Sequence, residues 1–237
     1  MNTISNKVAY ITGGSKGIGF GIAKILLEDG MRVAITSRTL EAAKKAAALL
    51  SKDPSKILAI ESDVISMAAE TEAIEATIAH FGQLDAVVAN AGVGHFSNIE
   101  TLTEQEWKDT IDTNLSGVFN TVKAGIAALK QSKGYIITIA SLAGANFFEK
   151  GAAYNASKFG LVGFTQAIML DLRKYGIKVT TIMPGSVATN FANQVSNKAD
   201  DWKIQPEDIG QLVADLLKMN PRTLPSKIEV RPSIPGK

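Results

Sequence analysis

The sequence predicts a doubly wound α/β fold, in which a parallel sheet of about seven strands carries helices on both faces. Short apolar runs alternate with helical patterns along most of the 237 residues. A glycine-rich turn joins the first apolar run to the first helical pattern, and polar residues follow the third and fourth apolar runs. Because open α/β sheets bind ligands at the carboxyl ends of their strands, this class also indicates where a site would lie.

The predicted elements alternate in order along the chain. Seven apolar runs are predicted as strands: Val8–Thr12, Arg32–Ser37, Ile57–Glu61, Leu84–Asn90, Tyr135–Ala140, Lys178–Met183 and Lys227–Arg231. Six longer patterns are predicted as helices: 17–29, 40–51, 66–80, 103–131, 151–175 and 206–219. Residues 186–205 are polar and weakly periodic, which indicates a substrate loop or lid. The length and the lack of a linker predict a single domain over residues 1–237.

Composition and charge narrow the classes of function. The 25 basic and 23 acidic side chains give a net charge of +2, which disfavours a nucleic-acid partner and favours small-molecule chemistry. The absence of cysteine excludes disulfides, thiolate metal sites and a cysteine nucleophile. Only two histidines occur, and no carboxylate cluster has ligand spacing, so no metal is expected. No secretory signal or bilayer-length apolar run is found, so a soluble cytoplasmic protein without a membrane partner is expected.

The turn after the first strand has the composition of a phosphate-binding loop. Three of its glycines are spaced Gly13-x-x-x-Gly17-x-Gly19. Glycines at a strand-to-helix turn let the backbone approach a pyrophosphate, and the helix N-terminus offers its N–H groups. The predicted cofactor-binding residues of this turn are Gly13, Ser15, Lys16, Gly17, Ile18 and Gly19. The alternative is a turn whose glycines serve only close helix packing.

The end of the second strand bears on which dinucleotide is bound. It reads Ile35 to Thr39, with Ser37 and Arg38 and with no carboxylate before Glu41. A carboxylate here would hold the ribose hydroxyl of NAD, whereas a guanidinium can grip a 2′-phosphate. Arg38, with Lys16 as a second cation, therefore favours NADP(H) over NAD(H). The alternative is that both cations are solvated surface charges.

Polar residues after the third and fourth strands extend the predicted cofactor site. Asp63, followed by Val64, can accept a hydrogen bond from an adenine amino group or can instead cap the next helix. The run Asn90, Ala91 and Gly92 would let the backbone pass beneath a ribose. Asn114 is unusual in a helix interior, because its amide competes for backbone hydrogen bonds. It predicts either a kink that holds water or an exposed asparagine.

Tyr154, Lys158 and Ser141 form the predicted catalytic group. Tyr154 and Lys158 are i and i+4 neighbours in the helical pattern 151–175, so they project from one face. A nearby ammonium would lower the pKa of the phenol and let it exchange a proton with an alcohol. Ser141, which follows the strand Tyr135–Ala140, can donate a hydrogen bond to the same substrate oxygen. The alternative is a solvated pair of the kind that occurs by chance on helix surfaces.

Together these residues resemble the short-chain dehydrogenase/reductase family over about residues 5 to 190. The glycine turn, Asn90 to Gly92, and the triad of Ser141, Tyr154 and Lys158 are similar to its motifs. Asn114 resembles a fourth catalytic member, and Pro184, Gly185, Val187 and Thr189 resemble its nicotinamide-contacting segment. The resemblance implies a Rossmann fold, hydride transfer between a nicotinamide and a carbonyl or alcohol, and Tyr154 as general acid/base. It also implies that Tyr154 and Lys158 belong to the cofactor-binding residues, with Lys158 bonded to the nicotinamide ribose. It also implies a homotetramer, or a homodimer, built largely through helices 103–131 and 151–175.

The resemblance leaves the substrate open among small ketones, aldehydes and 3-oxo or 3-hydroxy acids. The core resembles 3-oxoacyl-acyl-carrier-protein reductases, while the last strand resembles NADP-dependent 3-hydroxy acid dehydrogenases. A carrier-protein reductase should carry a basic patch beside the site. Lys130, Lys133, Arg173 and Lys174 are candidates for it, although Ser132 and Tyr175 replace expected arginines. A non-catalytic NADP(H)-binding sensor or scaffold is the alternative of another class, and the intact Ser141, Tyr154 and Lys158 disfavour it.

The predicted substrate pocket lies around the catalytic group. Its residues are Gly94, His95, Phe96, Ser141, Phe147, Phe148 and Tyr154. His95 is interpreted as part of the wall, because Tyr154 already fills the acid/base role. Phe147 and Phe148 can alternatively belong to the core or to a subunit interface.

Overall fold

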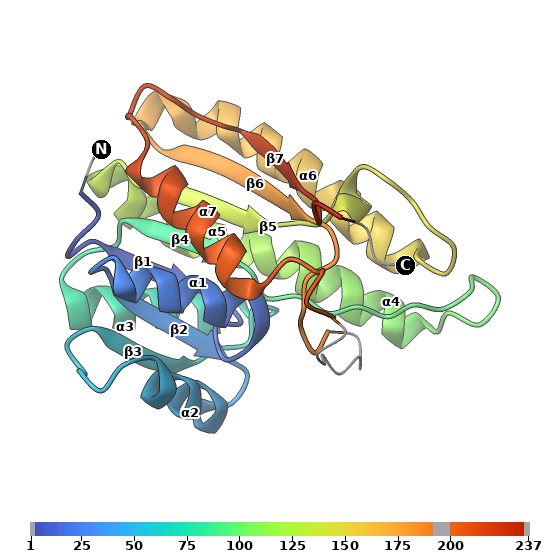
Figure 1. Ribbon diagram of the computed structural model, residues 1–237, viewed down its shortest axis with the longest axis horizontal. Coiled ribbons are helices and arrows are strands. Elements are labelled where there is room, and N and C mark those ends of the chain that lie inside the picture. The colour runs from blue at the N-terminus through green and yellow to red at the C-terminus, as the bar shows by residue number, and fades with distance from the viewer. Residues whose placement is uncertain (1–2, 192–199, 235–237) are drawn as a thin grey trace.

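A computed structural model describes residues 3–191 and 200–234 and confirms the predicted α/β Rossmann architecture. Seven parallel strands form one sheet in the order β3-β2-β1-β4-β5-β6-β7 (Figure 1). The strands are β1 Val8–Ile11, β2 Arg32–Ser37, β3 Ile57–Glu61, β4 Ala86–Ala89, β5 Tyr135–Ile139, β6 Lys178–Pro184 and β7 Lys227–Val230. The α-helices are α1 Gly17–Glu28, α2 Leu40–Leu50, α3 Met67–Phe81, α4 Glu104–Ile111, α5 Gly117–Ser132, α6 Ala152–Leu172 and α7 Pro206–Lys218.

Helices cover both faces of the sheet, as the alternating pattern predicted. Side chains of β1 alternate between the faces: Ala9 and Ile11 join the core beneath α1, α2 and α7, while Val8 and Tyr10 join the core beneath α3, α5 and α6. Successive side chains of a strand point to opposite faces, so buried strands such as these are apolar throughout. The sheet therefore lies between two layers of helices (Figure 1), with an apolar core on each face.

The order of the strands switches sides between β1 and β4, although all the strands are parallel. Strands β2 and β3 extend the sheet to one side of β1, and β5, β6 and β7 extend it from β4 to the other side. The loops after β1 and β4 therefore diverge and leave a crevice at the carboxyl ends of the strands. In Figure 1 the long loop after β4 leads to α4, which lies at one end of the molecule.

The predicted helix 103–131 is interrupted rather than continuous. Helices α4 and α5 are separated by a π-helical turn over Asp112–Ser116, with Asn114 at its centre. Asn114 is fully buried, so the alternative of an exposed asparagine is wrong. Its amide bonds to groups outside the helix, and such competition disrupts regular helical pairing.

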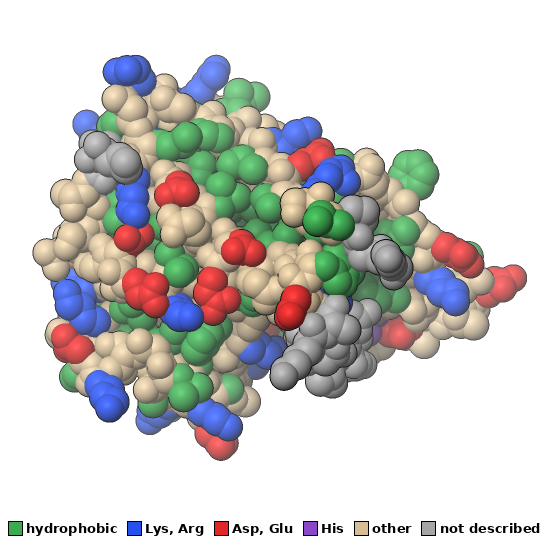
Figure 2. All heavy atoms as spheres, in the orientation of Figure 1, with side chains coloured by type: hydrophobic (Ala, Val, Ile, Leu, Met, Phe, Trp, Pro, Cys, Tyr) green, Lys and Arg blue, Asp and Glu red, His purple; other side chains and the backbone are tan. Residues whose placement is uncertain are grey.

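The surface carries charges of both signs. On the face drawn in Figure 2, acidic and basic side chains are interspersed. Of the helices within residues 3–191 and 200–234, none has the length and apolar character needed to cross a bilayer.

A buried carboxylate that the sequence analysis did not single out connects three elements beneath the sheet. Glu70 of α3 is fully buried and accepts hydrogen bonds from three hydroxyl groups. The donors are Tyr10 Oη at 3.0 Å, Ser62 Oγ at 2.6 Å and Thr121 Oγ1 at 2.7 Å. Burial raises the pKa of Tyr10 well above its usual value, and the negative charge of Glu70 raises it further. The network joins β1, α5 and the loop after β3 to α3.

Removing this carboxylate is expected to destabilise the fold. In Glu70→Ala the three buried hydroxyls lose their acceptor, which should lower the free energy of unfolding by about 3 kcal/mol. Glu70→Gln keeps one acceptor oxygen and should lose about 1 kcal/mol. Urea unfolding measures both values, and Glu72→Gln on the exposed side of α3 is the control. A Glu70→Ala protein as stable as the wild type would show that the network contributes nothing.

Candidate active site

The glycine turn after β1 is shaped by backbone conformations that favour glycine. Gly13 and Gly17 have φ angles of +63° and +57°. A Cβ atom at Gly13 would lie 3.0 Å from the Cα of Ala91, so a side chain there would also fill the turn. Helix α1 begins at Gly17, and no side chain of the described residues caps its N-terminus. The open amides and the glycine cradle fit the pyrophosphate of a dinucleotide.

The segment Asn90 to Gly92 braces this turn from β4. The side-chain amide of Asn90 donates to the carbonyl of Thr12 at 2.8 Å. In return, the hydroxyl of Thr12 accepts hydrogen bonds from the backbone N–H groups of Asn90 and Ala91, each at 3.0 Å. These reciprocal bonds hold the first and fourth strand ends together, a role that the sequence analysis did not predict.

The end of β2 presents an unpaired cation beside the glycine turn. Ser37 Oγ lies 3.3 Å from Ser15 Oγ, which brings the two predicted cofactor segments together. Arg38 is exposed and has no hydrogen-bond or ion-pair partner among the residues described. Glu61 is the register neighbour of Ser37 on β3, and its carboxylate accepts the N–H of Leu40 at 2.8 Å. The carboxylate nearest in register is thus engaged by the N-terminus of α2.

The loop after β3 is held by a hydrogen bond of its own and by bonds to neighbouring helices. Asp63 accepts the backbone N–H of Ile65 at 3.2 Å, whereas Ser66 caps α3. The alternative of Asp63 as the helix cap is therefore wrong. Asn120 of α5 donates to the carbonyl of Val64 at 2.9 Å. Asp63 and Val64 lie at the carboxyl end of β3, where the adenine was predicted.

Tyr154 and Lys158 lie on one face of α6, beside Ser141 at the carboxyl end of β5. Lys158 Nζ lies 5.7 Å from the centroid of the Tyr154 ring and donates to the carbonyl of Ile139 at 3.0 Å. Only 5% of Lys158 is exposed, so the alternative of a solvated surface pair is wrong. Ser141 Oγ accepts the N–H of Ala143 at 3.1 Å. The three predicted catalytic residues therefore converge.

The pKa shifts of this pair differ from the sequence expectation. Burial lowers the pKa of Lys158 to about 8, since water no longer solvates the ammonium. Burial also raises the pKa of Tyr154, and a hydrogen bond with Ser141 acts in the opposite direction. The expected lowering by Lys158 does not appear, because with a pKa of about 8 this lysine is already neutral at the pH where Tyr154 loses its proton. Tyr154 is thus a neutral phenol that holds its proton.

Asn114 anchors the π-helical turn to two parts of the site. Its Oδ1 accepts the N–H of Val93 at 2.8 Å, and its Nδ2 donates to the carbonyl of Val93 at 2.9 Å. The same Nδ2 donates to Ser157 Oγ of α6 at 3.1 Å. Asn114 therefore positions the loop after β4 against the helix that carries Tyr154 and Lys158. Its role in holding a water stays a prediction.

The predicted nicotinamide segment returns to the glycine turn. Pro184 ends β6, and the N–H of Gly185 donates to the carbonyl of Val230. A Cβ atom at Gly17 would lie 3.4 Å from the methyl group of Thr189, so the two segments are in contact. An isolated parallel bridge pairs Val187 with Ile204. Residues 192–199 of the predicted lid 186–205 lie outside the described residues.

Three phenylalanine rings lie around Tyr154. The ring centroids of Phe96, Phe148 and Phe191 lie 5.4, 6.5 and 5.9 Å from that of Tyr154. Phe96 and Phe148 were predicted for the pocket. The loop after Gly185 was also predicted as part of its wall, but Phe191 was not singled out within that polar stretch. Phe147 is 86% exposed and makes no ring contact among the described residues, so its pocket role stays a prediction.

The two remaining predicted pocket residues lie in the loop after β4. A Cβ atom at Gly94 would lie 2.6 Å from the ring of Phe191, so glycine is needed for this ring to pack there. His95 is half-buried and acts electrostatically on Glu106 of α4. This position is compatible with a wall residue.

The predicted basic patch does not lie beside the site within one chain. Lys130 and Lys133 precede the start of β5, and Arg173 and Lys174 precede the start of β6. In a parallel sheet these positions lie at the amino ends of the strands, opposite to Tyr154. Lys130 Nζ instead lies over the ring of Tyr175, 3.9 Å from its centroid. The sequence expectation of a patch beside the site is therefore wrong for a single chain.

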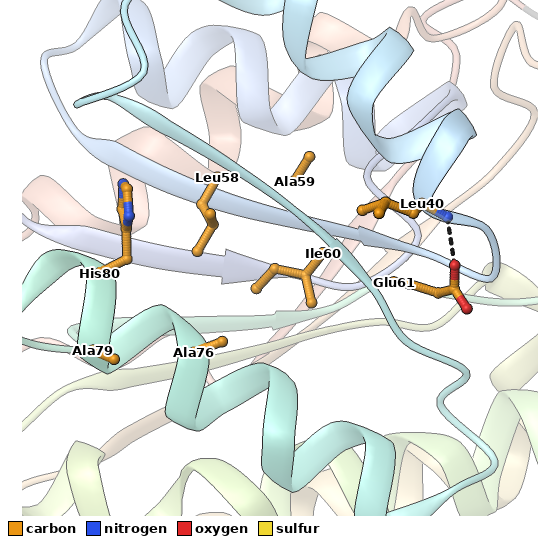
Figure 3. Close-up of a pocket in the computed structure, with 8 residues that line it drawn as sticks. All are labelled: Leu40, Leu58, Ala59, Ile60, Glu61, Ala76, Ala79 and His80. Atoms are coloured by element: carbon orange, nitrogen blue, oxygen red, sulfur yellow. Dashed lines mark hydrogen bonds between the residues drawn. The ribbon is translucent and has the colours of Figure 1, made fainter.

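A separate hollow follows the outer edge of β3. Its volume is about 600 Å³, and Figure 3 shows its lining residues. They are Leu40, Leu58, Ala59, Ile60, Glu61, Ala76, Ala79 and His80. None of the predicted site residues lines this hollow, so it is distinct from the site at the strand ends.

Comparisons with known proteins agree over nearly the whole length. A family model described as short chain dehydrogenase matches residues 7–200. An uncharacterized oxidoreductase of Staphylococcus aureus strain MW2 is 34% identical over 233 residues, which cover 98% of this chain and 100% of that protein. The structure of an alcohol dehydrogenase from the archaeon Thermococcus sibiricus, complexed with 5-hydroxy-NADP, has a TM-score of 0.91 and 29% identity over 97% of each chain. That of a 3-ketoacyl-(acyl-carrier-protein) reductase from Brucella melitensis, complexed with NADH, has a TM-score of 0.88 and 26% identity over 97% of this chain and 98% of that one.

Proposed function

Because this chain belongs to the short-chain dehydrogenase family, we propose that it is an NADP(H)-dependent oxidoreductase that interconverts a small carbonyl compound and its alcohol. The observation that carries the proposal is the convergence of Tyr154, Lys158 and Ser141 at the same edge of the sheet as the glycine turn. A proton donor is thereby placed beside a site that fits a dinucleotide. We further propose that residues 1–237 act as one catalytic domain, in the cytoplasm.

The proposed mechanism assigns the proton to Tyr154. The reduced nicotinamide, when bound, supplies the hydride for the carbonyl carbon, and the phenol of Tyr154 supplies the proton for the oxygen. The raised pKa keeps Tyr154 protonated near neutral pH, which suits the reduction direction. Ser141 donates a hydrogen bond to the developing oxyanion, and the Lys158 ammonium stabilises the phenolate left after proton transfer. Asn114 positions Lys158 by joining α6 to the loop after β4.

The preference for NADP(H) rests on the charges at the end of β2. Arg38 is exposed and unpaired among the described residues, and Lys16 is exposed at the start of α1. Glu61, the register neighbour of Ser37 on β3, accepts the N–H of Leu40 at the start of α2. Relatives are known with either an NADP analogue or NADH, so the charges of this chain carry the preference.

Replacing Arg38 by Ala is expected to weaken NADPH binding selectively. A charge-assisted hydrogen bond to the 2′-phosphate should contribute roughly 1.5–3 kcal/mol, so the Kd for NADPH should rise about 10- to 100-fold. The Kd for NADH should change by less than about threefold, because no phosphate is lost. Fluorescence titration measures both, with Lys45→Ala on the exposed side of α2 as the control. An unchanged Kd for NADPH would contradict this prediction.

A carrier-protein reductase and a non-catalytic sensor are the two alternatives to this function. A 3-oxoacyl-acyl-carrier-protein reductase is favoured by the likeness to the Brucella melitensis enzyme, but one chain places its basic residues at the opposite edge from Tyr154. A non-catalytic NADP(H)-binding sensor would not need a buried lysine beside a tyrosine. We therefore propose a small ketone, an aldehyde or a 3-oxo or 3-hydroxy acid as substrate.

A carbonyl panel tests the proposal directly. Purified protein is titrated with NADPH and NADH and is then assayed for loss of reduced-cofactor absorbance with ketones, aldehydes, 3-oxo esters and an acyl-carrier thioester. Turnover of a small carbonyl supports the proposal, and a strong preference for the thioester supports the carrier-protein reductase. Tight NADPH binding without turnover of any carbonyl would favour the sensor.

We propose that the protein is a homotetramer, or a homodimer, assembled through α5 and α6. Both helices expose aromatic side chains: Phe119 of α5 and Phe159 of α6. Exposed apolar groups of this size are typical of protein interfaces. Light scattering would contradict the proposal if it gave the 25.1 kDa mass of one chain.

A further inference from the structure

Three loops each place one phenylalanine ring against Tyr154. Phe96 follows β4, Phe148 lies between β5 and α6, and Phe191 follows β6. We call Phe96, Phe148, Phe191 and Tyr154 the aromatic cluster. Phe96 meets Tyr154 edge to face at an interplanar angle of 76°, and it meets Phe148 at a centroid distance of 5.7 Å. The cluster therefore surrounds the proton donor with ring edges and faces from separate segments.

The rings are held in place although they are partly open to solvent. Phe96 is 41% and Phe148 47% exposed. Asn155 accepts the N–H of Phe148 at 3.4 Å and donates to the carbonyls of Ala143 and Asn146, at 2.7 and 2.8 Å. A preorganised, half-open apolar surface gains free energy when an apolar group covers it.

In the described part of the chain, Lys158 is the one cation that lies over a ring of the cluster. Its ammonium is buried and donates to the carbonyl of Ile139, behind Tyr154. A substrate carboxylate placed against the rings of Phe96, Phe148 and Phe191 would lose hydrogen bonds to water that the apolar rings cannot replace.

We infer that the substrate is an uncharged ketone or aldehyde with an aromatic group on the carbonyl carbon. This inference rests on the proposed function, since it requires the carbonyl oxygen to lie against Tyr154 and Ser141. With the oxygen there, the substituents of the carbonyl carbon meet the rings of the cluster. An aromatic substituent offers edge-to-face contacts that an alkyl group of similar reach does not. The reaction is the reduction already described, so it needs no additional reactant.

Four related substrates separate ring recognition from charge. Ethyl phenylglyoxylate and ethyl pyruvate are neutral and differ in the phenyl group, while phenylglyoxylate and pyruvate are the matching carboxylates. With saturating NADPH, kcat/KM should be roughly tenfold or more higher for ethyl phenylglyoxylate than for ethyl pyruvate. Each ester should exceed its carboxylate by at least about tenfold, because the anion would lose hydrogen bonds to water against apolar rings.

Variants test whether the aromatic cluster causes the preference. Phe96→Ala and Phe148→Ala should each reduce the phenyl advantage, which is the ratio of kcat/KM for ethyl phenylglyoxylate to that for ethyl pyruvate, by about two- to tenfold. Phe96→Leu and Phe148→Leu remove the ring but keep an apolar side chain of similar size. They therefore test the loss of the ring even if the alanine variants do not fold. Ile99→Ala is the matched control on the loop of Phe96, since Ile99 is 72% exposed.

The outcomes distinguish this inference from the proposed function. Turnover that prefers the neutral phenyl compound, and that loses the preference in the Phe96 or Phe148 variants but not in Ile99→Ala, supports the inference. Equal turnover of the two esters, faster turnover of the carboxylates, or a phenyl preference unchanged in every variant would overturn it and leave the reductase proposal intact. No turnover of any carbonyl, with NADPH bound, would overturn both.

Discussion

Tyr154→Phe is expected to lower kcat by about two to four orders of magnitude while leaving the Kd for NADPH within about twofold. The substitution removes one hydroxyl group and keeps the ring. The contacts of that ring with Phe96, Phe148 and Phe191 therefore persist, and the loss reports proton transfer rather than packing. Steady-state assays with the carbonyl panel measure kcat, and fluorescence titration measures the Kd.

A second tyrosine provides the control for this experiment. Tyr175 lies at the amino end of β6, away from the site, and is partly exposed. Tyr175→Phe should keep wild-type kcat. If Tyr154→Phe retained wild-type kcat in a folded protein, Tyr154 would not be the acid, and the proposed mechanism would fail.

Lys158→Met is expected to abolish most of the turnover and yet to stabilise the protein near pH 7. Burial lowers the pKa of Lys158 from 10.5 to about 8, so below pH 8 the folded state carries a desolvated ammonium. The pKa difference corresponds to roughly 3 kcal/mol of lost stability at 1.36 kcal/mol per unit. Loss of the hydrogen bond to Ile139 offsets about 1 kcal/mol of this, so the net gain should be about 2 kcal/mol.

The stability difference between Lys158→Met and the wild type should depend on pH. Between the two pKa values the unfolded state holds a proton that the folded state has released, so wild-type stability should rise as the pH increases from about 8 to 10.5. The advantage of Lys158→Met should disappear over the same window. Urea unfolding at pH 7 and near pH 10 measures both proteins, and Lys44→Met on the exposed side of α2 is the control. A Lys158→Met protein less stable than wild type at pH 7 would contradict the burial argument.

The rate of carbonyl reduction should also depend on the protonation of Lys158. If the ammonium of Lys158 stabilises the phenolate, kcat/KM for carbonyl reduction should fall as the pH rises through about 8. A profile that stays flat through this region, with a chemical step limiting the rate, would show that the charge of Lys158 is not required.

The elements and their order were predictable because their signals are local. Strands β2 and β3 lie within the bounds read from the apolar runs, and α6 places Tyr154 and Lys158 on one face as the i, i+4 spacing requires. Asn114 predicted the interruption between α4 and α5, because its side-chain amide competes for backbone hydrogen bonds. In each case the information is contained in a few neighbouring residues.

Partners and environments were decided by the tertiary structure. The bonds between Asn90 and Thr12, the three hydroxyls on Glu70 and the contact of Phe191 with Tyr154 each join segments that are distant in the sequence. The direction of the Tyr154 pKa shift was wrong at the sequence level for the same reason, because spacing brings a lysine near but does not report burial. Local periodicity determines where an element forms, whereas desolvation and contact depend on how all the elements pack.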